Sequence, residues 1–335
     1  MVKYKTPEFL EKKGIILSRE QVPYDSALTF NAGVCRYGDG YAMLFRNDYG
    51  FCKQDFEDFY AGISDNTNPR TNIGAAFSRD GRTWEVSPQS VFELKNDSIF
   101  RAYDPRLTDL GDGSYGLCFA VDSNVGIRGG IAVTEDMQNF EIKHISVPDN
   151  RNMVLFPEKI NGYYYRLERP FLSNSSRYSI WISRSPDLIH WGESFPVLNA
   201  WNLPFSNDKI GPGAPPVKTS CGWLTLFHSV EIQDFSFDSW CRGWKKCYCG
   251  GVMLLDLEDP SKVIAVSNKP LLVPEEKYEL EGFRGGVVFP GGLIVENDGS
   301  CKIYYGAADT VECLAEANVD DLIEFCFSNN IIKSK

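Results

Sequence analysis

The amino-acid sequence predicts an all-β fold, a five-bladed β-propeller, from one recurring pattern and its spacing. The pattern is a short turn containing glycine, then an apolar and aromatic run, then a polar or charged residue. Such turns favour tight hairpins because they tolerate positive φ. Successive copies are 49 to 77 residues apart, which is long enough for one blade and a loop. The five turns are at residues 38–40, 111–113, 161–162, 221–222 and 298–299.

A second pattern lies between copies of the first and predicts a further strand in the blades. It is an apolar run that enters a tight turn with an aromatic residue just beyond. Copies cover residues 75–84, 131–140 and 180–191, and a weaker one covers 251–256. Four-stranded propeller blades need such alternating strands. We expect one domain over residues 1–335 with short terminal extensions, which include short helices at 6–13 and 319–327.

Composition and charge restrict the class of protein. The 335 residues are 43% hydrophobic and 13% aromatic, which suits a large folded core. No stretch reaches the roughly 18–20 apolar residues of a membrane helix, and the charged first residues do not form a signal peptide. We therefore expect a cytoplasmic protein that has no membrane partner. The net charge of −11 argues against a nucleic-acid partner, because phosphate backbones require a basic face.

The ten cysteines raise the question of a metal site or disulfides. The spacing of Cys241, Cys247 and Cys249 is not that of a structural zinc site. Others, such as Cys35 and Cys118, lie inside apolar strand runs. Without a secretory signal, these residues are expected to be reduced and to belong to the core.

Polar residues at the ends of the repeats are candidates for one shared pocket. Propellers place ligand sites near the axis on one face, where loops and strand ends of several blades converge. Each residue alone could also be a solvated strand end, but matching positions in five repeats favour a common site. The candidates are Arg46, Asn47, Asp122, Arg169, His228 and Asp309.

The motif Tyr103-Asp104-Pro105-Arg106 contains a candidate catalytic carboxylate. Proline disfavours the helical conformation of the residue before it, so we expect an extended backbone at Asp104. Asp104 could be a turn former, or a single catalytic acid that Arg101 or Arg106 orients.

Two further basic residues indicate an anion site. Arg151 lies in a polar cluster before an apolar strand, and Lys209 heads a rigid loop rich in glycine and proline. The structural alternatives are a loop between blades and a solvated lysine. Together with Arg169 and His228, they supply two guanidiniums, an ammonium and an imidazole, a set suited to phosphate or another oxyanion. The sequence contains no Walker loop and no glycine-rich nucleotide fingerprint.

These residues lie in motifs that resemble glycoside hydrolase family 130, the inverting β-mannoside phosphorylases with a five-bladed propeller. The resemblance runs from about residue 30 to residue 323. Residues 126–130 and 166–170 are most similar to the branch that phosphorolyses 4-O-β-D-mannosyl-D-glucose. Other branches act on mannooligosaccharides, on mannosyl-N-acetylglucosamine or on β-1,2-mannosides. The motifs cover residues 30–33, 103–106, 126–130, 148–159, 166–170, 208–212, 254–260 and 304–310.

The resemblance implies a role for each candidate. Asp104 is implied as the general acid, which protonates the glycosidic oxygen through the 3-hydroxyl of the mannosyl unit. The implied phosphate-binding residues are Arg151, Arg169, Lys209, His228 and Tyr248. The implied substrate-binding residues are Asn31, Arg46, Tyr103, Asn152, Phe283 and Asp309.

The resemblance also implies the reaction, in which phosphate is the nucleophile and converts 4-O-β-D-mannosyl-D-glucose to α-D-mannose 1-phosphate and D-glucose. An inverting hydrolase needs a second carboxylate to activate water, whereas phosphate arrives already anionic. No metal or organic cofactor is implied, and a homo-oligomer is expected. The alternatives are a mannooligosaccharide phosphorylase or β-mannosidase of the same family, and a non-catalytic sugar-binding propeller.

Overall fold

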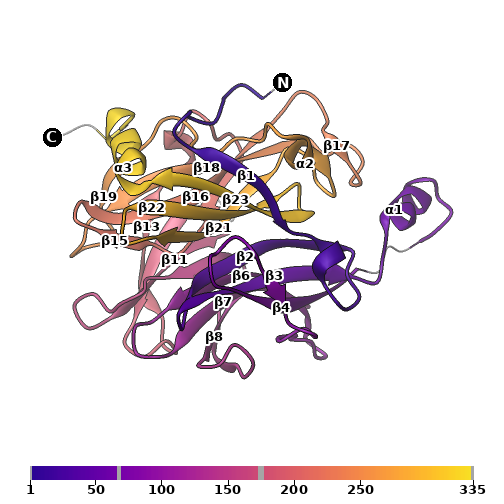
Figure 1. Cartoon of the computed structure of the whole chain (residues 1–335), viewed down its shortest axis with the longest axis horizontal. Helices are drawn as coiled ribbons and strands as arrows, with labels where there is room; N and C mark the ends of the chain where they lie inside the picture. The colour runs from indigo at the N-terminus through magenta and orange to yellow at the C-terminus, as the bar shows by residue number, and fades with distance from the viewer. Residues whose placement is uncertain (1, 66–68, 173–176, 333–335) are drawn as a thin grey trace.

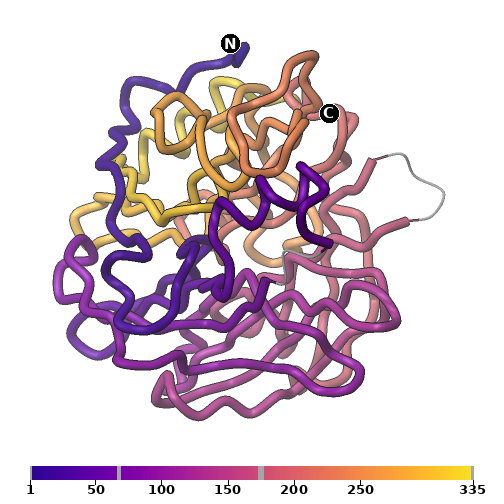
Figure 2. The backbone as a smooth tube through the Cα atoms, turned by 90° about the vertical axis from the view of Figure 1, so that its right-hand side faces the viewer, coloured from indigo at the N-terminus to yellow at the C-terminus, as the bar shows by residue number. Residues whose placement is uncertain are grey.

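The computed structural model describes residues 2–65, 69–172 and 177–332, and its strands form five antiparallel sheets around a common centre (Figures 1 and 2). This arrangement confirms the predicted five-bladed propeller. The first strands of neighbouring blades contact one another, β2 with β6, β6 with β10 and β10 with β14. The residues on these first strands therefore face the centre of the ring.

Blades 1 to 3 are sheets of four consecutive strands, and blade 5 also includes a strand from the N-terminal segment. Blade 1 comprises β2 (Leu28–Tyr37), β3 (Gly40–Tyr49), β4 (Arg70–Ser78) and β5 (Glu85–Val86). Blade 2 comprises β6 (Ile99–Asp109), β7 (Tyr115–Ser123), β8 (Gly126–Thr134) and β9 (Glu141–Ile145). Blade 3 comprises β10 (Asn150–Leu155), β11 (Tyr164–Pro170), β12 (Ile180–Ser185) and β13 (Gly192–Leu198).

The last two blades are less regular. Blade 4 comprises β14 (Lys209–Pro212), β15 (Val217–Thr219), β16 (Gly222–Ile232), β18 (Lys246–Leu255) and β19 (Val263–Val266). Blade 5 comprises β21 (Val288–Val295), β22 (Ser300–Ala307), β23 (Val311–Asn318) and β1 (Glu11–Leu17). A short parallel pair, β17 (Asp238–Ser239) with β20 (Glu281–Gly282), joins two loops outside the blades.

The two sequence patterns correspond to the hairpins of the blades. The first pattern marks the turn that leads into the second strand in blades 1, 2, 3 and 5, and the turn between β15 and β16 in blade 4. The second pattern marks the third strand and the turn after it. In blades 1 to 4, one carboxylate oxygen in that turn accepts two backbone N–H groups, which stabilises it. These carboxylates belong to Asp80, Asp136, Asp187 and Asp256.

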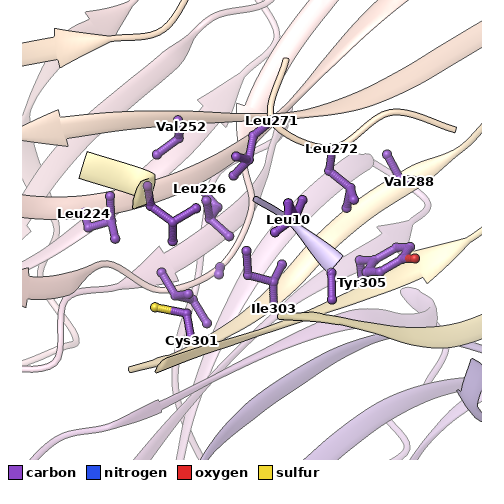
Figure 3. Close-up of a cluster of buried hydrophobic side chains, with 14 of the residues drawn as sticks. Leu10, Leu224, Leu226, Val252, Leu271, Leu272, Val288, Cys301, Ile303 and Tyr305 are labelled. Carbon is purple, nitrogen blue, oxygen red and sulfur yellow. The ribbon is translucent and has the colours of Figure 1, made fainter. Parts of the chain in front are cut away.

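The N-terminal segment closes the ring, because β1 pairs antiparallel with β23 as the outer strand of blade 5 (Figure 1). The predicted helix at 6–13 is therefore wrong. Side chains along β1 alternate between exposed and half-buried, as in an edge strand, and pairing satisfies backbone groups that β23 would otherwise leave open. Leu10, which is 4% exposed, packs just before β1 between residues of blades 4 and 5 (Figure 3).

The helices lie outside the blades. The predicted helix at 319–327 is confirmed as α3 (Val319–Ser328), and the side chain of Asn318 caps its first turn. The sequence did not predict α1 (Lys53–Tyr60), which projects from blade 1 in Figure 1, or α2 (Lys277–Leu280). No helix in the described part of the chain is long and apolar enough to cross a membrane.

The core lies between adjacent blades. In the cluster of Figure 3, Leu226 and Val252 of blade 4 pack with Ile303 and Tyr305 of blade 5, and all four are almost fully buried. Burying a side chain of this size contributes about 1.5–3 kcal/mol. Seven cysteines are also buried, as expected of core residues: Cys35, Cys118, Cys247, Cys249, Cys301, Cys313 and Cys326.

Candidate active site

Three first strands share one backbone irregularity at the centre of the ring. In β2, β6 and β10 the register with the second strand breaks at a β-bulge. The bulges contain Asn31, Asp104 and Asn152, whose φ angles are 54°, 53° and 57°. Bulges re-aim side chains, and non-glycine residues with positive φ cluster at functional sites. Three blades therefore direct a polar side chain to one place.

The backbone of Asp104 corrects one expectation. An extended conformation was predicted because proline follows, but the φ of 53° lies in the left-handed region. Aspartate is one of the few residues that visits this region, since its short polar side chain can form local hydrogen bonds. The bulge in β6 outweighs the preference that Pro105 imposes.

A cavity of about 410 Å³ opens at the centre of the ring, and all twelve residues with implied roles line it. Of the candidates from the repeats, Asn47 and Asp122 do not. Asn47 is buried, and its side-chain amide donates to Asp25 O and to Asn72 Oδ1, both at 3.0 Å. Asp122 binds Tyr103 instead, as described below.

Carboxylates occupy one side of the cavity. Asp104 Oδ1 accepts hydrogen bonds from Asn31 Nδ2 at 3.0 Å and from Arg46 Nη1 at 3.2 Å. Burial acts to raise the pKa of Asp104, but the guanidiniums of Arg46 and Arg106 and the Asn31 hydrogen bond outweigh it and hold this pKa below its usual value. Burial raises the pKa of Asp309, and its ion pair with Arg284 at 2.9 Å offsets this only in part.

Cations occupy the other side. Arg169 is 1% exposed, and its Nη1 lies 3.1 Å from His228 Nε2. A guanidinium can only donate, so His228 accepts at Nε2 and is neutral. Burial lowers the pKa of His228 well below its usual value, and the charge of Arg169 acts in the same direction. Gly211 permits this close packing, because a Cβ atom there would lie 2.5 Å from His228 Cε1.

One of the cations, Arg169, is buried without a counter-ion among the described residues. No carboxylate in the described ranges pairs with Arg169, and its Nε and Nη2 have no hydrogen-bond partner. Burial lowers the pKa of Arg169 to about 9, and Arg151 acts in the same direction. Burial and the charge of Arg169 lower the pKa of Lys209 to about 7, although Asp208 lies 3.5 Å from its ammonium. An unpaired buried charge is unfavourable, so this side of the cavity is built to receive an anion.

Several residues of the cavity wall had no assigned role from the sequence. Phe56 and Pro69 belong to the insertion between β3 and β4, Trp244 lies just before β18, and Lys246 is the first residue of β18. These segments lie outside the repeats, so no periodic signal marks them. Arg284 could have been found, because it directly follows Phe283, which the resemblance implies as a substrate-binding residue. Asp48 lies two residues after Arg46 in β3, so strand alternation places both side chains on the same face.

Glu312 in β23 supports the wall from behind. Its side chain is fully buried, Oε2 accepts the Ala32 N–H at 3.0 Å, and Oε1 has no partner in the described chain. Burial raises the pKa of Glu312 to about 8. Folding therefore favours the protonated carboxyl.

Replacing Glu312 by glutamine should flatten the pH dependence of stability. Between about pH 4.5 and 8 the folded protein holds a proton that the unfolded chain has released, so unfolding free energy falls as pH rises. Glutamine retains an acceptor for Ala32 without titrating. The wild-type free energy of unfolding should therefore fall relative to the variant by up to about 1.4 kcal/mol per pH unit. Urea denaturation from pH 5 to 9 measures this difference, and parallel curves would contradict it.

Comparison with known proteins agrees with this geometry. Residues 7–328 match the model of glycoside hydrolase family 130, described as β-1,4-mannooligosaccharide phosphorylase. The chain is 33% identical to the β-1,4-mannooligosaccharide phosphorylase of Ruminococcus albus, over 95% of this chain and 90% of that protein. It is 29% identical to the 4-O-β-D-mannosyl-D-glucose phosphorylase of Bacteroides fragilis, over 89% and 75%.

A solved structure shares the fold. The β-1,2-mannobiose phosphorylase of Listeria innocua, in complex with β-1,2-mannobiose, superposes with a TM-score of 0.77 at 27% identity, over 98% of this chain and 95% of that one. These relatives differ in the linkage or acceptor that their names give, and their identities to this chain are similar. The chain belongs to glycoside hydrolase family 130, a family of mannoside phosphorylases.

Proposed function

We propose that this protein phosphorolyses 4-O-β-D-mannosyl-D-glucose with inversion, giving α-D-mannose 1-phosphate and D-glucose. The observation that carries the proposal is the cation cluster of Arg151, Arg169 and Lys209, which lines the same cavity as Asp104 and contains the buried Arg169. Guanidinium groups bind phosphate oxygens in pairs, and such charge-assisted hydrogen bonds are strong. A bound phosphate dianion would supply the counter-charge that Arg169 lacks.

The carboxylates fit direct displacement. An inverting hydrolase uses one carboxylic acid and a second carboxylate that activates water. Here Arg284 binds Asp309, and the Arg46 guanidinium contacts both Asp48 and Asp104, so each of these carboxylates is held by an arginine and none is free to activate water. We assign the acid to Asp104 and a sugar hydroxyl contact to Asp309, as the family resemblance implies. Phosphate needs no activation because it is already an anion.

The proposed step conserves atoms and protons. A phosphate oxygen attacks the anomeric carbon from the α face while the bond from that carbon to the glucose O4 breaks. Asp104 gives its proton to the 3-hydroxyl of the mannosyl unit, and that hydroxyl gives its own proton to the departing O4. Asp104 ends as a carboxylate, which Asn31 and Arg46 stabilise.

A second candidate substrate, a β-1,4-mannooligosaccharide, is favoured by one observation. The Ruminococcus albus enzyme named for β-1,4-mannooligosaccharides matches nearly the whole chain. Motifs at 126–130 and 166–170 support mannosyl-glucose instead. Both substrates share the β-1,4 linkage and the same mannosyl subsite, and they differ only in what occupies the acceptor side.

Incubation with 4-O-β-D-mannosyl-D-glucose should release glucose only when phosphate is present. Phosphorus and proton NMR of the first product should show α-D-mannose 1-phosphate. The matched comparison is β-1,4-mannotriose at the same concentration, and faster phosphorolysis of the trisaccharide would replace the first substrate by the second. Free mannose as the main product in abundant phosphate, or β-D-mannose 1-phosphate, would contradict phosphorolysis with inversion.

A further inference from the structure

A chain of hydrogen bonds connects Asp122, which does not line the cavity, through Tyr103 to Arg151 in the cavity wall. Tyr103 OH donates to Asp122 Oδ1 at 2.8 Å, and Arg151 Nη1 donates to the same hydroxyl oxygen at 3.1 Å. Arg101 Nε donates to Asp122 Oδ2 at 2.7 Å. A guanidinium can only donate, so the Tyr103 hydroxyl must accept from Arg151. Its single hydrogen is then available for Asp122, and the carboxylate fixes the direction of the hydroxyl.

Tyr103 lies between the two sides of the active site. It is 3% exposed, and the guanidiniums of Arg46 and Arg101 lie 5.0 Å and 4.8 Å from the centre of its ring. Cations over a tyrosine face hold the ring in place. The ring therefore cannot turn freely, and its hydroxyl is held where Arg151 meets it. The Nε of Arg151 is buried without a partner in the described chain.

The geometry points to Asp122 as a positioning residue for phosphate, an inference that rests on the proposed function. Asp122 orients the Tyr103 hydroxyl, and this hydroxyl holds the Arg151 guanidinium in the orientation that receives a phosphate oxygen. Asp122 ends the second sequence repeat but does not line the cavity. Its effect on phosphate is therefore transmitted through Tyr103.

The test is Asp122→Asn. Arg101 and Tyr103 donate to different oxygens of Asp122, and in the amide one of these two atoms becomes a nitrogen that can only donate. If its N–H faces Tyr103, the hydroxyl hydrogen turns toward Arg151, where two donors oppose each other. Phosphate dissociation constants from calorimetry should rise roughly ten-fold or more, while the KM for the disaccharide stays nearly unchanged.

Two further variants make the test specific. Tyr103→Phe removes the hydroxyl and keeps the ring, so it should weaken phosphate binding as well, and adding Asp122→Asn to it should cause no further loss. Asp112→Asn is the matched control in the same blade. Asp112 lies in the turn before β7, where its carboxylate accepts from the N–H and the hydroxyl of Ser114, so phosphate binding should not change. Melting temperatures establish that every variant is folded.

The outcomes separate the two proposals. A wild-type protein that binds no phosphate would contradict the proposed function itself. A wild type that binds phosphate, with an Asp122→Asn variant that binds it equally well, would overturn only the positioning role. Equal weakening of phosphate and disaccharide, or additive losses in the double variant, would also overturn it, because Asp122 would then act on the fold or through Arg101.

Discussion

Asp104→Asn should lower kcat for 4-O-β-D-mannosyl-D-glucose by roughly 10²–10⁴-fold, because the amide cannot donate the proton that the leaving oxygen needs. Asparagine has the same shape and also tolerates positive φ, so the bulge in β6 should be retained. Phosphate binding should persist, since the hydrogen bonds of Asp104 are with Asn31 and Arg46, which are not members of the cluster of Arg151, Arg169 and Lys209. Steady-state kinetics with calorimetry of phosphate binding measures both effects.

The pKa of Asp104 makes its role as general acid depend on bound phosphate. Without ligand, Arg46, Arg106 and Arg151 hold the pKa below its usual value despite burial, so the carboxyl is ionised at neutral pH. A phosphate dianion beside Arg151 adds negative charge and excludes water, and both changes raise the pKa of a carboxyl. The acid is thus expected to take up its proton only when the nucleophile is bound.

A substrate with an activated leaving group provides the control. A 2,4-dinitrophenyl β-mannoside needs no proton on departure, so Asp104→Asn should retain most of the wild-type rate with it. Asp309→Asn should lose similar activity on both substrates, because Asp309 is proposed to bind the sugar. More than about a tenth of the wild-type rate on the disaccharide for Asp104→Asn would contradict general acid catalysis by this residue.

The repeats predicted which strand ends meet, but not always which side chain faces the cavity. Arg46, Asn47 and Asp48 are consecutive in β3, and side chains alternate between the two faces of a strand. Arg46 and Asp48 therefore line the cavity, and Asn47 points away. Residues two apart in a strand share a face, so this rule, starting from Arg46, would have selected Asp48 in place of Asn47 as a candidate for the site.

Features that depend on distant parts of the chain were not predictable from local patterns. β1 is a strand because β23 offers an open edge some 300 residues later, and the residues at 6–13 do not reveal this. The left-handed backbone of Asp104 depends on the bulge against β7, which no dipeptide rule contains. Phe56 reaches the cavity from an insertion outside the repeats.

One motif of the family resemblance has a structural explanation. A Cβ atom on Gly129 would lie 2.4 Å from Met153, and one on Gly130 would lie 2.2 Å from Phe119. These glycines allow blade 2 to pack closely, and Met153 directly follows Asn152 of the site. The motif at 126–130 thus makes room for Met153 beside the β10 bulge that contains Asn152. Its own residues do not line the cavity.

Replacing Arg169 by methionine should raise the KM for phosphate by roughly 100-fold or more, because phosphate loses hydrogen bonds from a charged group. The KM for the disaccharide should change far less. The ligand-free variant should also melt at a higher temperature than the wild type. Arg169 is buried without a carboxylate partner among the described residues, and burial lowers its pKa to about 9. Methionine fills similar space without a charge that must be desolvated.

Arg166→Met is the matched control, because Arg166 lies on the same strand and is as well buried, but is paired with Glu168 at 2.9 Å. Removing it leaves the buried carboxylate of Glu168 without its counter-ion, so the melting temperature should fall while the phosphate KM of the folded protein stays the same. Phosphate should raise the melting temperature of the wild type and of Arg166→Met, and have little effect on Arg169→Met, because a ligand stabilises only the protein that binds it. A lower melting temperature for Arg169→Met, with equal weakening of phosphate and disaccharide, would show that Arg169 serves the fold. The two replacements are thus expected to change the melting temperature in opposite directions, although the arginines are three residues apart. The reason is that the counter-ion of Arg166 is part of the chain, whereas that of Arg169 is the proposed co-substrate.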